Sequence, residues 1–343
     1  MTSTRRPTPA QFFRELAGEI HLVTWTLYKV MIPTLLVVKL LQEMGVLVYL
    51  SWLLSPLMAL VGLPESMGIV WTATIMTNLY AGMLVFIDLA KSETLSVAQV
   101  TVLCTIMLVS HGLPVEARIA QRAGIKLSIT LLIRIGGALL FGWLLHRIYS
   151  AGDFLQQANE VAWDPGVIDT SLQAWAITQL QGLFIILLII ALLLTALKVL
   201  RLVGIDRLLE LLLSPFLRLM GIGREATTLT VVGMTLGLSI GGGLLIREAE
   251  QGHVSRRDIF ASLTMLALCH SLIEDTLLMM LLGAHVSGVI WLRLLFTMLT
   301  LAIITRWLNR RSDTFMERWL FNRYVGAETD TGLTKNPRAN HRQ

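Results

Sequence analysis

Charged residues are scarce in this chain, and their scarcity excludes a soluble domain with an ordinary surface. Asp, Glu, Lys and Arg make up 15% of the 343 residues, 55% are hydrophobic, and the mean hydropathy is +0.68. Apolar runs of roughly 20 residues, the length that crosses a bilayer, recur from Leu22 to Ile304 and leave no room for a sizeable soluble domain. The sequence therefore predicts an all-α, polytopic transmembrane helical bundle.

Cysteine and catalytic motifs are equally sparse. Cys104 and Cys269 both lie inside apolar runs and predict no disulfide. The chain has neither a strand-borne nucleophile elbow nor the His-Glu-x-x-His and Cys-x-x-Cys motifs of zinc sites, so we expect no enzyme and no cofactor. The first ten residues have no apolar stretch with a cleavage site, so we expect no cleaved signal peptide. The net charge of +5 gathers at segment ends and in the tails, which indicates membrane topology and no nucleic-acid partner.

The chain does contain an internal repeat. Leu54-Ser55-Pro56 recurs as Leu213-Ser214-Pro215, and 213 − 54 = 159. Scarce residue types match at the same shift without a gap: Lys39 with Lys198, Gly45 with Gly204, Gly62 with Gly221, Gly82 with Gly241, His111 with His270, Arg134 with Arg293 and Arg147 with Arg306. Because His, Arg and Pro are rare within spans, we infer a duplication that fixes the architecture.

Five apolar segments are predicted in each unit. In the first unit they are Leu22 to Leu41, Val46 to Leu63, Met67 to Leu89, Val97 to Leu113 and Leu127 to Tyr149. The predicted organisation is a cytoplasmic segment 1–21, a first repeat 22–149, an extracytoplasmic link 150–176, a second repeat 177–306 and a cytoplasmic basic tail 307–343. The second segment of each unit is amphipathic in its later copy, so an interfacial or re-entrant position is the alternative to a crossing.

The charge of the loops decides the orientation. An odd number of crossings per unit inverts the second copy, and a cytoplasmic N-terminus then places the basic loop 118–126 and the tail inside. The acidic link, which has no Lys or Arg between Ser150 and Gln173, falls outside. Arg218 and Arg224 also fall outside in this scheme and count against it. We expect inverted-topology repeats in the cell (inner) membrane, with both termini cytoplasmic.

The fourth segments end in a matched polar constellation. His111-Gly112-Leu113-Pro114-Val115-Glu116 aligns with His270-Ser271-Leu272-Ile273-Glu274-Asp275. Ionisable side chains at such depth are costly to desolvate and mark functional sites. Gly112 and Pro114 are expected to break the helix, and interrupted helices at matching positions of two halves indicate a transporter site.

Helical spacing gives the expected partners. On an unbroken helix His270 and Glu274 share a face, so we expect Glu274 to be the neighbour of His270. Arg134 and Arg293, at the same place in each fifth segment, are the expected counter-ions of Glu116 and Asp275.

Two other interpretations of the constellation stay open. The same side chains can pair only to fix helix packing in lipid. Alternatively they form a mixed nitrogen and oxygen metal site, made of His111, Glu116, His270 and Asp275.

Small and polar residues interrupt the third segments. Asn78 is the only amide of its span and is expected to face a solute or to bond between helices. Gly82 aligns with Gly241, which opens the triplet Gly241, Gly242 and Gly243. Three glycines weaken a helix, so the triplet predicts a kink or break, with close helix packing as the alternative.

The run Leu54-Ser55-Pro56-Leu57-Met58, followed by Gly62-Leu63-Pro64 and by the segment 78–82, resembles the nucleoside-recognition or Gate family. That family includes the spore maturation proteins A and B, and related segments occur in concentrative nucleoside transporters and ferrous iron transporter B. The resemblance covers about residues 35–147 and 194–306. It implies a bacterial or archaeal membrane protein with a duplicated gate unit, and its label suggests nucleosides.

Together these features predict a secondary transporter or permease with a midplane site at the repeat interface. The histidine and carboxylate pairs would couple a small polar solute, a nucleoside by resemblance only, to a proton or cation. A divalent metal ion permease and a non-transporting scaffold of the spore-maturation type are the alternatives. The expected partners are the bilayer and a small solute or cation, with a homo-oligomer or a second membrane subunit as further candidates.

Overall fold

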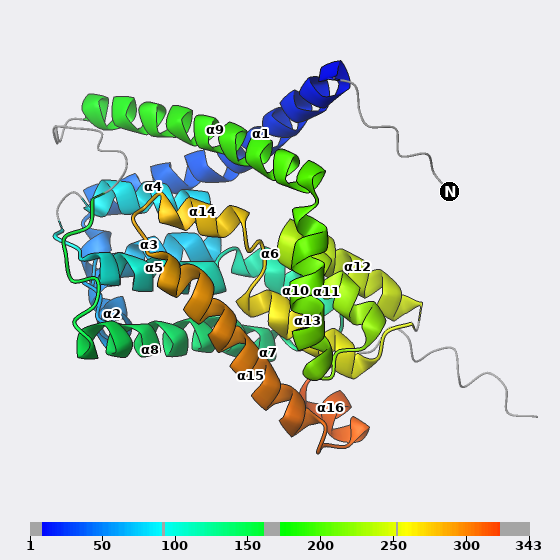
Figure 1. The fold of residues 1–343 in the computed structure, drawn as a ribbon. Helices are drawn as coiled ribbons and strands as arrows, with labels where there is room; N and C mark the ends of the chain where they lie inside the picture. Colours follow the sequence, from blue (N-terminus) through cyan, green and yellow to red (C-terminus); the bar gives the residue numbers. More distant parts are fainter. Residues whose placement is uncertain (1–8, 91–92, 161–171, 252, 323–343) are drawn as a thin grey trace, which may run out of the picture.

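Every regular element in the part of the chain that the structure describes is a helix (Figure 1). This computed structural model describes residues 9–90, 93–160, 172–251 and 253–322. The first half contains α1 Pro9–Glu43, α2 Val46–Leu60, α3 Met67–Met76, α4 Leu79–Leu89, α5 Val97–Ser110, α6 Leu113–Arg122, α7 Leu127–Leu131, the π-helical η2 Leu132–Gly136 and α8 Gly137–Ala151. The stretches that are long and apolar enough to cross a membrane are Gln11–Leu41, Val97–Arg122, Leu127–Ala151, Leu172–Leu200 and Ser287–Leu308. The prediction of an all-α polytopic bundle is confirmed.

The second half repeats the order of the first. It contains α9 Leu172–Val203, α10 Ile205–Leu219, α11 Arg224–Leu236, α12 Leu238–Glu250, α13 Arg256–Leu268, α14 Glu274–Met280, η3 Ser287–Leu292 and α15 Arg293–Leu308. At the shift of 159, α1 to α5 fall on α9 to α13 in turn, and a π-helical segment precedes both α8 and α15. A short helix, α16 Asp313–Trp319, follows the second unit.

The two halves run in opposite directions. α1 and α9 lie side by side and antiparallel, and α8 ends on the side of the molecule where α15 begins (Figure 1). Lys198 near the end of α9 pairs with Glu15 at 3.4 Å and Glu19 at 3.0 Å near the start of α1. These ion pairs join acidic residues in the N-terminal part of α1 to α9, and α1 begins at Pro9, well before the expected boundary at residue 22.

The third segment of the first half does not cross the bundle as expected. It folds into a hairpin, because α3 and α4 pack against each other and are separated only by Thr77 and Asn78. A Cβ added to Gly82 would lie 1.8 Å from Oγ1 of Thr74. In one continuous helix those residues would be about 12 Å apart along the axis, so the two helices must be antiparallel. Ser66 and Glu93, at the open ends of the hairpin, hydrogen-bond at 2.6 Å.

The second half contains the matching hairpin, α11 and α12, and it corrects the prediction for the glycine triplet. The turn is at Gly237, where φ is 93° and ψ is 163°, a conformation that favours glycine. Gly241, Gly242 and Gly243 are helical within α12. Gly241 instead provides close packing, since a Cβ there would lie 2.3 Å from the Cα of Gly233 on α11. The break at the triplet was therefore wrong, and close packing was the correct alternative for Gly241.

Contacts between distant segments define two ends of the molecule. At the first, the link end, Gln99 donates to the carbonyl of Gly62 and the amide of Asn159 donates to the carbonyl of Leu95 at 2.8 Å. The hairpin of α3 and α4 enters the bundle from this end and returns to it. In the first half three stretches remain that are long and apolar enough to cross a membrane, Gln11–Leu41, Val97–Arg122 and Leu127–Ala151, and an odd number agrees with the opposite direction of the second half.

At the opposite, tail end, the amide of Lys126 donates to the carbonyl of Leu320 at 2.8 Å, which joins the loop after α6 to the chain after α16. The amide of Gly223 donates to Oδ1 of Asp258 at 2.8 Å, which joins the start of α11 to the start of α13. The hairpin of α11 and α12 therefore opens at the tail end. Arg218 and Arg224, which contradicted the five-crossing scheme, lie at the same end as the other basic loops.

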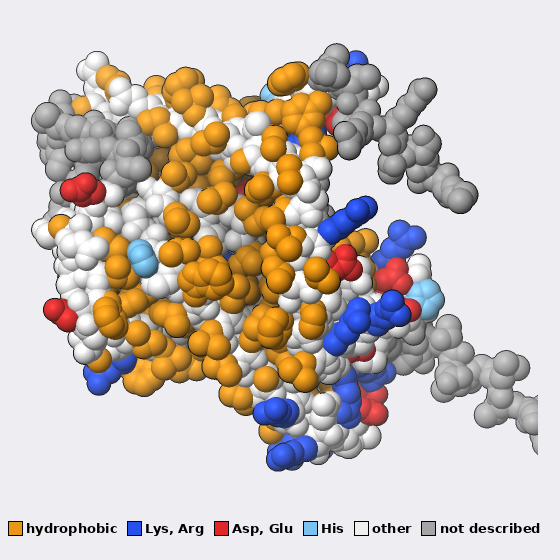
Figure 2. Space-filling view, in the orientation of Figure 1, with side chains coloured by type: hydrophobic (Ala, Val, Ile, Leu, Met, Phe, Trp, Pro, Cys, Tyr) orange, Lys and Arg blue, Asp and Glu red, His pale blue; other side chains and the backbone are white. Residues whose placement is uncertain are grey.

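The surface agrees with this arrangement. In Figure 2, hydrophobic side chains form a broad band over the long helices, and Lys and Arg gather around α10 to α12 and α16. Exposed apolar side chains on the long helices include Leu188 and Leu192 on α9 and Leu299 and Ile303 on α15. α10 stands across the direction of α9 and is outside the set of crossing stretches, in agreement with the interfacial alternative for the second segments (Figure 1).

The hairpins give a binary labelling prediction. In intact cells, an impermeant maleimide labels only cysteines on the outer side of the membrane. The variants Arg122→Cys and Arg218→Cys should therefore be either both labelled or both unlabelled, and Gln157→Cys should give the other result. All three positions are exposed, and Cys104 and Cys269 are 0% exposed and should stay silent. Labelling of Arg218→Cys together with Gln157→Cys would show that the third segment crosses after all.

Candidate functional site

The two matched histidines meet at the interface between the halves. Nε2 of His111 lies 3.1 Å from Nε2 of His270. Both residues are buried, with exposed fractions of 8% for His111 and 2% for His270. Each histidine stands at a helix break: α5 ends at Ser110 and α6 begins at Leu113, after Gly112 with φ 58°. His111 is 14 residues after Val97 and 11 before Arg122, so the pair lies near the middle of that apolar stretch.

Backbone carbonyls fix the tautomer of both rings. Nδ1 of His111 faces the carbonyls of Met107 at 3.3 Å and Leu108 at 3.2 Å, and Nδ1 of His270 faces the carbonyl of Leu266 at 2.6 Å. A carbonyl oxygen only accepts, so each Nδ1 must carry the proton. In the neutral rings both Nε2 atoms then present lone pairs to each other, which requires a proton or a cation between them.

Two carboxylates, one from each half, approach the same point. Oε1 of Glu116 lies 3.3 Å from Nε2 of both histidines. Oδ2 of Asp275 lies 3.7 Å from Nε2 of His111. The cluster predicted from sequence is therefore assembled in space, with both repeats contributing an imidazole and an acid.

The arginines hold the helix breaks. Nη2 of Arg134 donates to the carbonyl of His111 at 2.7 Å, and Nη2 of Arg293 donates to the carbonyl of His270 at 3.2 Å. Both arginines are 0% exposed, so they bind inside the bundle and do not reach toward headgroups. Breaking a helix in an apolar interior frees carbonyls that need donors, and the guanidiniums supply them.

The two arginines differ in whether they form an ion pair with the carboxylate of their own half. Arg134 forms an ion pair with Oε2 of Glu116, as the sequence predicts. The expected counterpart, Arg293 with Asp275, is absent from the ion pairs within 4 Å in the described part of the chain. Aspartate is one methylene shorter than glutamate, so its carboxylate does not extend to the guanidinium from the equivalent position.

The expected pairing of Glu274 with His270 is wrong. α13 ends at Leu268 and α14 begins only at Glu274, so the spacing of a continuous helix does not apply between them. The hydroxyl of Tyr80, on α4, instead donates to Oε1 of Glu274 at 3.2 Å. Asp275, and not Glu274, approaches the histidines.

The hairpin turns contact the broken helices, an arrangement that the sequence did not reveal. The amide of Gly112 donates to the carbonyl of Thr74 at 3.1 Å, and the amide of Leu272 donates to the carbonyl of Met234 at 2.8 Å. Asn78 begins α4, and its Oδ1 accepts from the amide of Ala81 at 2.9 Å, so it acts as a helix cap and not as an interhelical bond.

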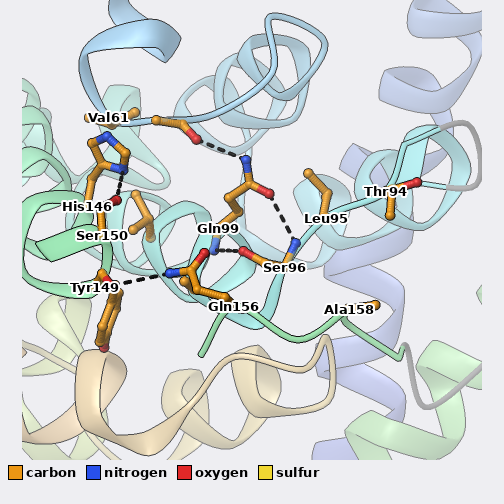
Figure 3. Close-up of a pocket in the computed structure, with 13 residues that line it drawn as sticks. Val61, Thr94, Leu95, Ser96, Gln99, His146, Tyr149, Ser150, Gln156 and Ala158 are labelled. Carbon is orange, nitrogen blue, oxygen red and sulfur yellow. Dashed lines mark hydrogen bonds between the residues drawn. The ribbon is translucent and has the colours of Figure 1, made fainter. Parts of the chain in front are cut away.

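Cavities of very different size lie along the bundle. Beside Glu116 and Arg134 is a cavity of about 20 Å³, which has room for one water or ion. At the link end a polar cavity of about 380 Å³ lies between the end of α2, the start of α5 and the end of α8, with His146, Ser150 and Gln156 around it (Figure 3). Its deepest residue on α5, Val102, precedes His111 by nine residues, or about 13 Å of helix.

One relative is similar over most of the chain. The "Uncharacterized membrane protein YvoD" of Bacillus subtilis (strain 168) is 33% identical over 289 residues, which covers 83% of this chain and 91% of that protein. No protein-family model matches the chain, and no solved structure matches it significantly.

Proposed function

We propose that this chain, which belongs to the membrane-protein family that includes YvoD of Bacillus subtilis, is a secondary transporter or permease driven through its buried histidine and carboxylate cluster. One observation carries the proposal: two hairpin turns and two broken helices, contributed equally by inverted halves, meet at one buried charged site. Non-helical backbone is tolerated at membrane depth where it lines a path or a binding site.

The charges of the site favour a cation. Arg134 and Arg293 are balanced by Glu116 and Asp275, and Glu274 adds a further carboxylate, so three acids against two guanidiniums leave one formal negative charge when the imidazoles are neutral. An anionic solute would increase that unbalanced charge in a medium that screens poorly. A proton or metal cation would reduce it, and the paired lone pairs of the imidazoles are where it would bind.

The size of the site favours an ion as cargo, which makes a divalent metal permease the second candidate. The two Nε2 atoms lie 3.1 Å apart and Oε1 of Glu116 lies 3.3 Å from each of them, which leaves space for an ion between them but not for a nucleoside in this conformation. A nucleoside, suggested by the Gate resemblance, would need the hairpins to move apart and would approach from the polar cavity at the link end. The proposal assigns the cluster no catalytic step.

The orientation forms part of the proposal. The basic tail end, which holds Arg218, Arg224 and the loop after α6, is cytoplasmic by the positive-inside rule. Both the start of α1 and α16 lie at that end, so both termini face the cytoplasm. The polar cavity then opens toward the outside of the cell membrane.

Proteoliposomes test the transport proposal. The liposomes carry a pH-sensitive dye inside and an imposed membrane potential, and either Co²⁺ or uridine is offered outside. The wild-type protein should then admit Co²⁺ itself or protons. His111→Ala combined with His270→Ala should reduce the flux to that of protein-free liposomes, because the lone-pair site is removed. His253→Ala, which changes an exposed histidine paired with Glu248, should leave it intact. Wild-type protein that moves neither probe nor protons would favour a scaffold.

A further inference from the structure

We propose that the cluster is a tetrahedral site for a divalent transition-metal ion of the zinc and cobalt class. Its ligands are Nε2 of His111, Nε2 of His270, Oε1 of Glu116 and Oδ2 of Asp275. The inference names the ion for the site of the proposed function, and it rests on that function only for the passage of the ion across the membrane.

The four ligand atoms lie at distances close to those around a tetrahedral ion. Ligands held about 2.0 to 2.1 Å from a tetrahedral ion lie about 3.3 to 3.4 Å from one another. The distances here are 3.1 Å between the two Nε2 atoms, 3.3 Å from Oε1 of Glu116 to each of them, and 3.7 Å from Oδ2 of Asp275 to Nε2 of His111. The atoms of three of these residues, both histidines and Asp275, all lie within 4.8 Å of one another, and Glu116 is the fourth ligand through its 3.3 Å distance to each Nε2.

Each histidine, and Glu116, has a second partner that orients it. Metal-binding histidines usually donate their other ring N–H to a carbonyl or carboxylate, which fixes the ring and raises its basicity. Both rings do so here, to Met107 and Leu108 in one case and to Leu266 in the other. Arg134 pairs with Oε2 of Glu116, which leaves Oε1 to face the imidazoles.

One carboxylate oxygen of the cluster has no hydrogen-bond donor among the described residues. Oδ2 of Asp275 is buried and accepts no hydrogen bond from any described residue, although the residue is 9% exposed. A buried carboxylate oxygen without a donor is costly, and a cation at this point would satisfy it. A proton shared by the two imidazoles would satisfy the rings but would leave this oxygen unpaired.

The ligand types select the class of ion. Calcium and magnesium take six or more oxygen ligands, whereas this site offers two imidazoles and two carboxylates. Zinc and cobalt accept four mixed nitrogen and oxygen ligands. We therefore expect Zn²⁺ and Co²⁺ to bind, with Mg²⁺ as an ineffective competitor.

Metal titration of the full-length protein in detergent tests the inference. After treatment with a chelator, Co²⁺ should bind with one ion per chain and give the intense visible absorption of tetrahedral cobalt, and Zn²⁺ should abolish that absorption. Asp275→Asn and Glu116→Gln should each weaken binding by more than about 100-fold, because a charged ligand is lost. His253→Ala should bind like the wild type, and an unchanged elution volume in size-exclusion chromatography shows that each variant is folded.

The outcomes separate this inference from the transport proposal. Wild-type protein that binds no Co²⁺ or Zn²⁺, or Asp275→Asn that binds as tightly as the wild type, overturns the metal site even if proton flux is observed. Metal binding that is lost in both acid variants supports the site. If such a protein moves no ion in proteoliposomes, the metal site stands and the transport proposal fails.

Discussion

Arg134→Met is expected to lower the thermal stability of the protein more than any other single substitution in the cluster. The guanidinium is 0% exposed, donates to the carbonyl of His111 and pairs with Glu116. Its removal leaves a buried carboxylate without a counter-ion and a freed carbonyl without a donor. Removing one partner of a buried ion pair costs about 3 to 5 kcal/mol.

The two native cysteines provide the measurement. Cys104 and Cys269 are buried, so a thiol-reactive fluorophore reports their exposure when the bundle unfolds on heating. Glu116→Gln in the Arg134→Met background should recover part of the loss, since it neutralises the stranded acid. Arg118→Met, at an exposed position, should change the midpoint little. If Arg134→Met alone unfolds at the wild-type temperature, the ion pair is not formed in the membrane protein.

Alanine at Gly241 and at Gly243 should have opposite effects on stability. A Cβ at Gly241 would lie 2.3 Å from the Cα of Gly233, so Gly241→Ala forces α11 and α12 apart, and overpacking of this kind costs about 1 to 3 kcal/mol. A Cβ at Gly243 meets nothing within 4 Å. Gly243→Ala removes the flexibility of glycine from an exposed helical position and should stabilise by about 0.4 to 1 kcal/mol.

The same thiol assay measures both variants, and transport adds a second readout. Because the turn of α11 and α12 contacts the broken helix at Leu272, Gly241→Ala should also reduce flux through the cluster. Gly243→Ala should leave flux unchanged. Equal destabilisation by the two substitutions would mean that the glycine triplet is a flexible break, as the sequence predicts, and that the hairpin is not packed closely.

The duplication and the position of the cluster could be predicted because they depend on rare residues. His, Arg and Pro are scarce in spans, so their recurrence at a shift of 159 was informative, and the step Gly112-Leu113-Pro114 lies where α5 gives way to α6. The arginine at the equivalent place in each half predicted a counter-ion, and Arg134 provides one for Glu116.

The hairpins could not be predicted from hydropathy. α3 and α4 together span 67–89, and a turn of two residues does not lower the hydropathy of so apolar a stretch. Length and composition are therefore equally consistent with one crossing helix and with a hairpin of two short helices. The signal that distinguishes them is local: an asparagine cap at Asn78 and a glycine with positive φ at Gly237, each at the middle of its run.

The partners of His270 could not be predicted for a related reason. Helical spacing places residues on a face only while the helix continues, and Ser271 with φ 46° lies within the interruption. Beyond it the register restarts, so Glu274 contacts Tyr80, Asp275 approaches His111, and the acid beside His270 is Glu116 from the other half.

The difference between Glu116 and Asp275 also bears on energetics. In a perfect duplicate, two halves that exchange roles would produce conformers that are related by a two-fold axis and equal in free energy. Asp275 is one methylene shorter than Glu116, and only the first half forms the ion pair between its arginine and its carboxylate. The two conformers would therefore differ in free energy. A carrier built this way has a preferred resting orientation before any gradient acts on it.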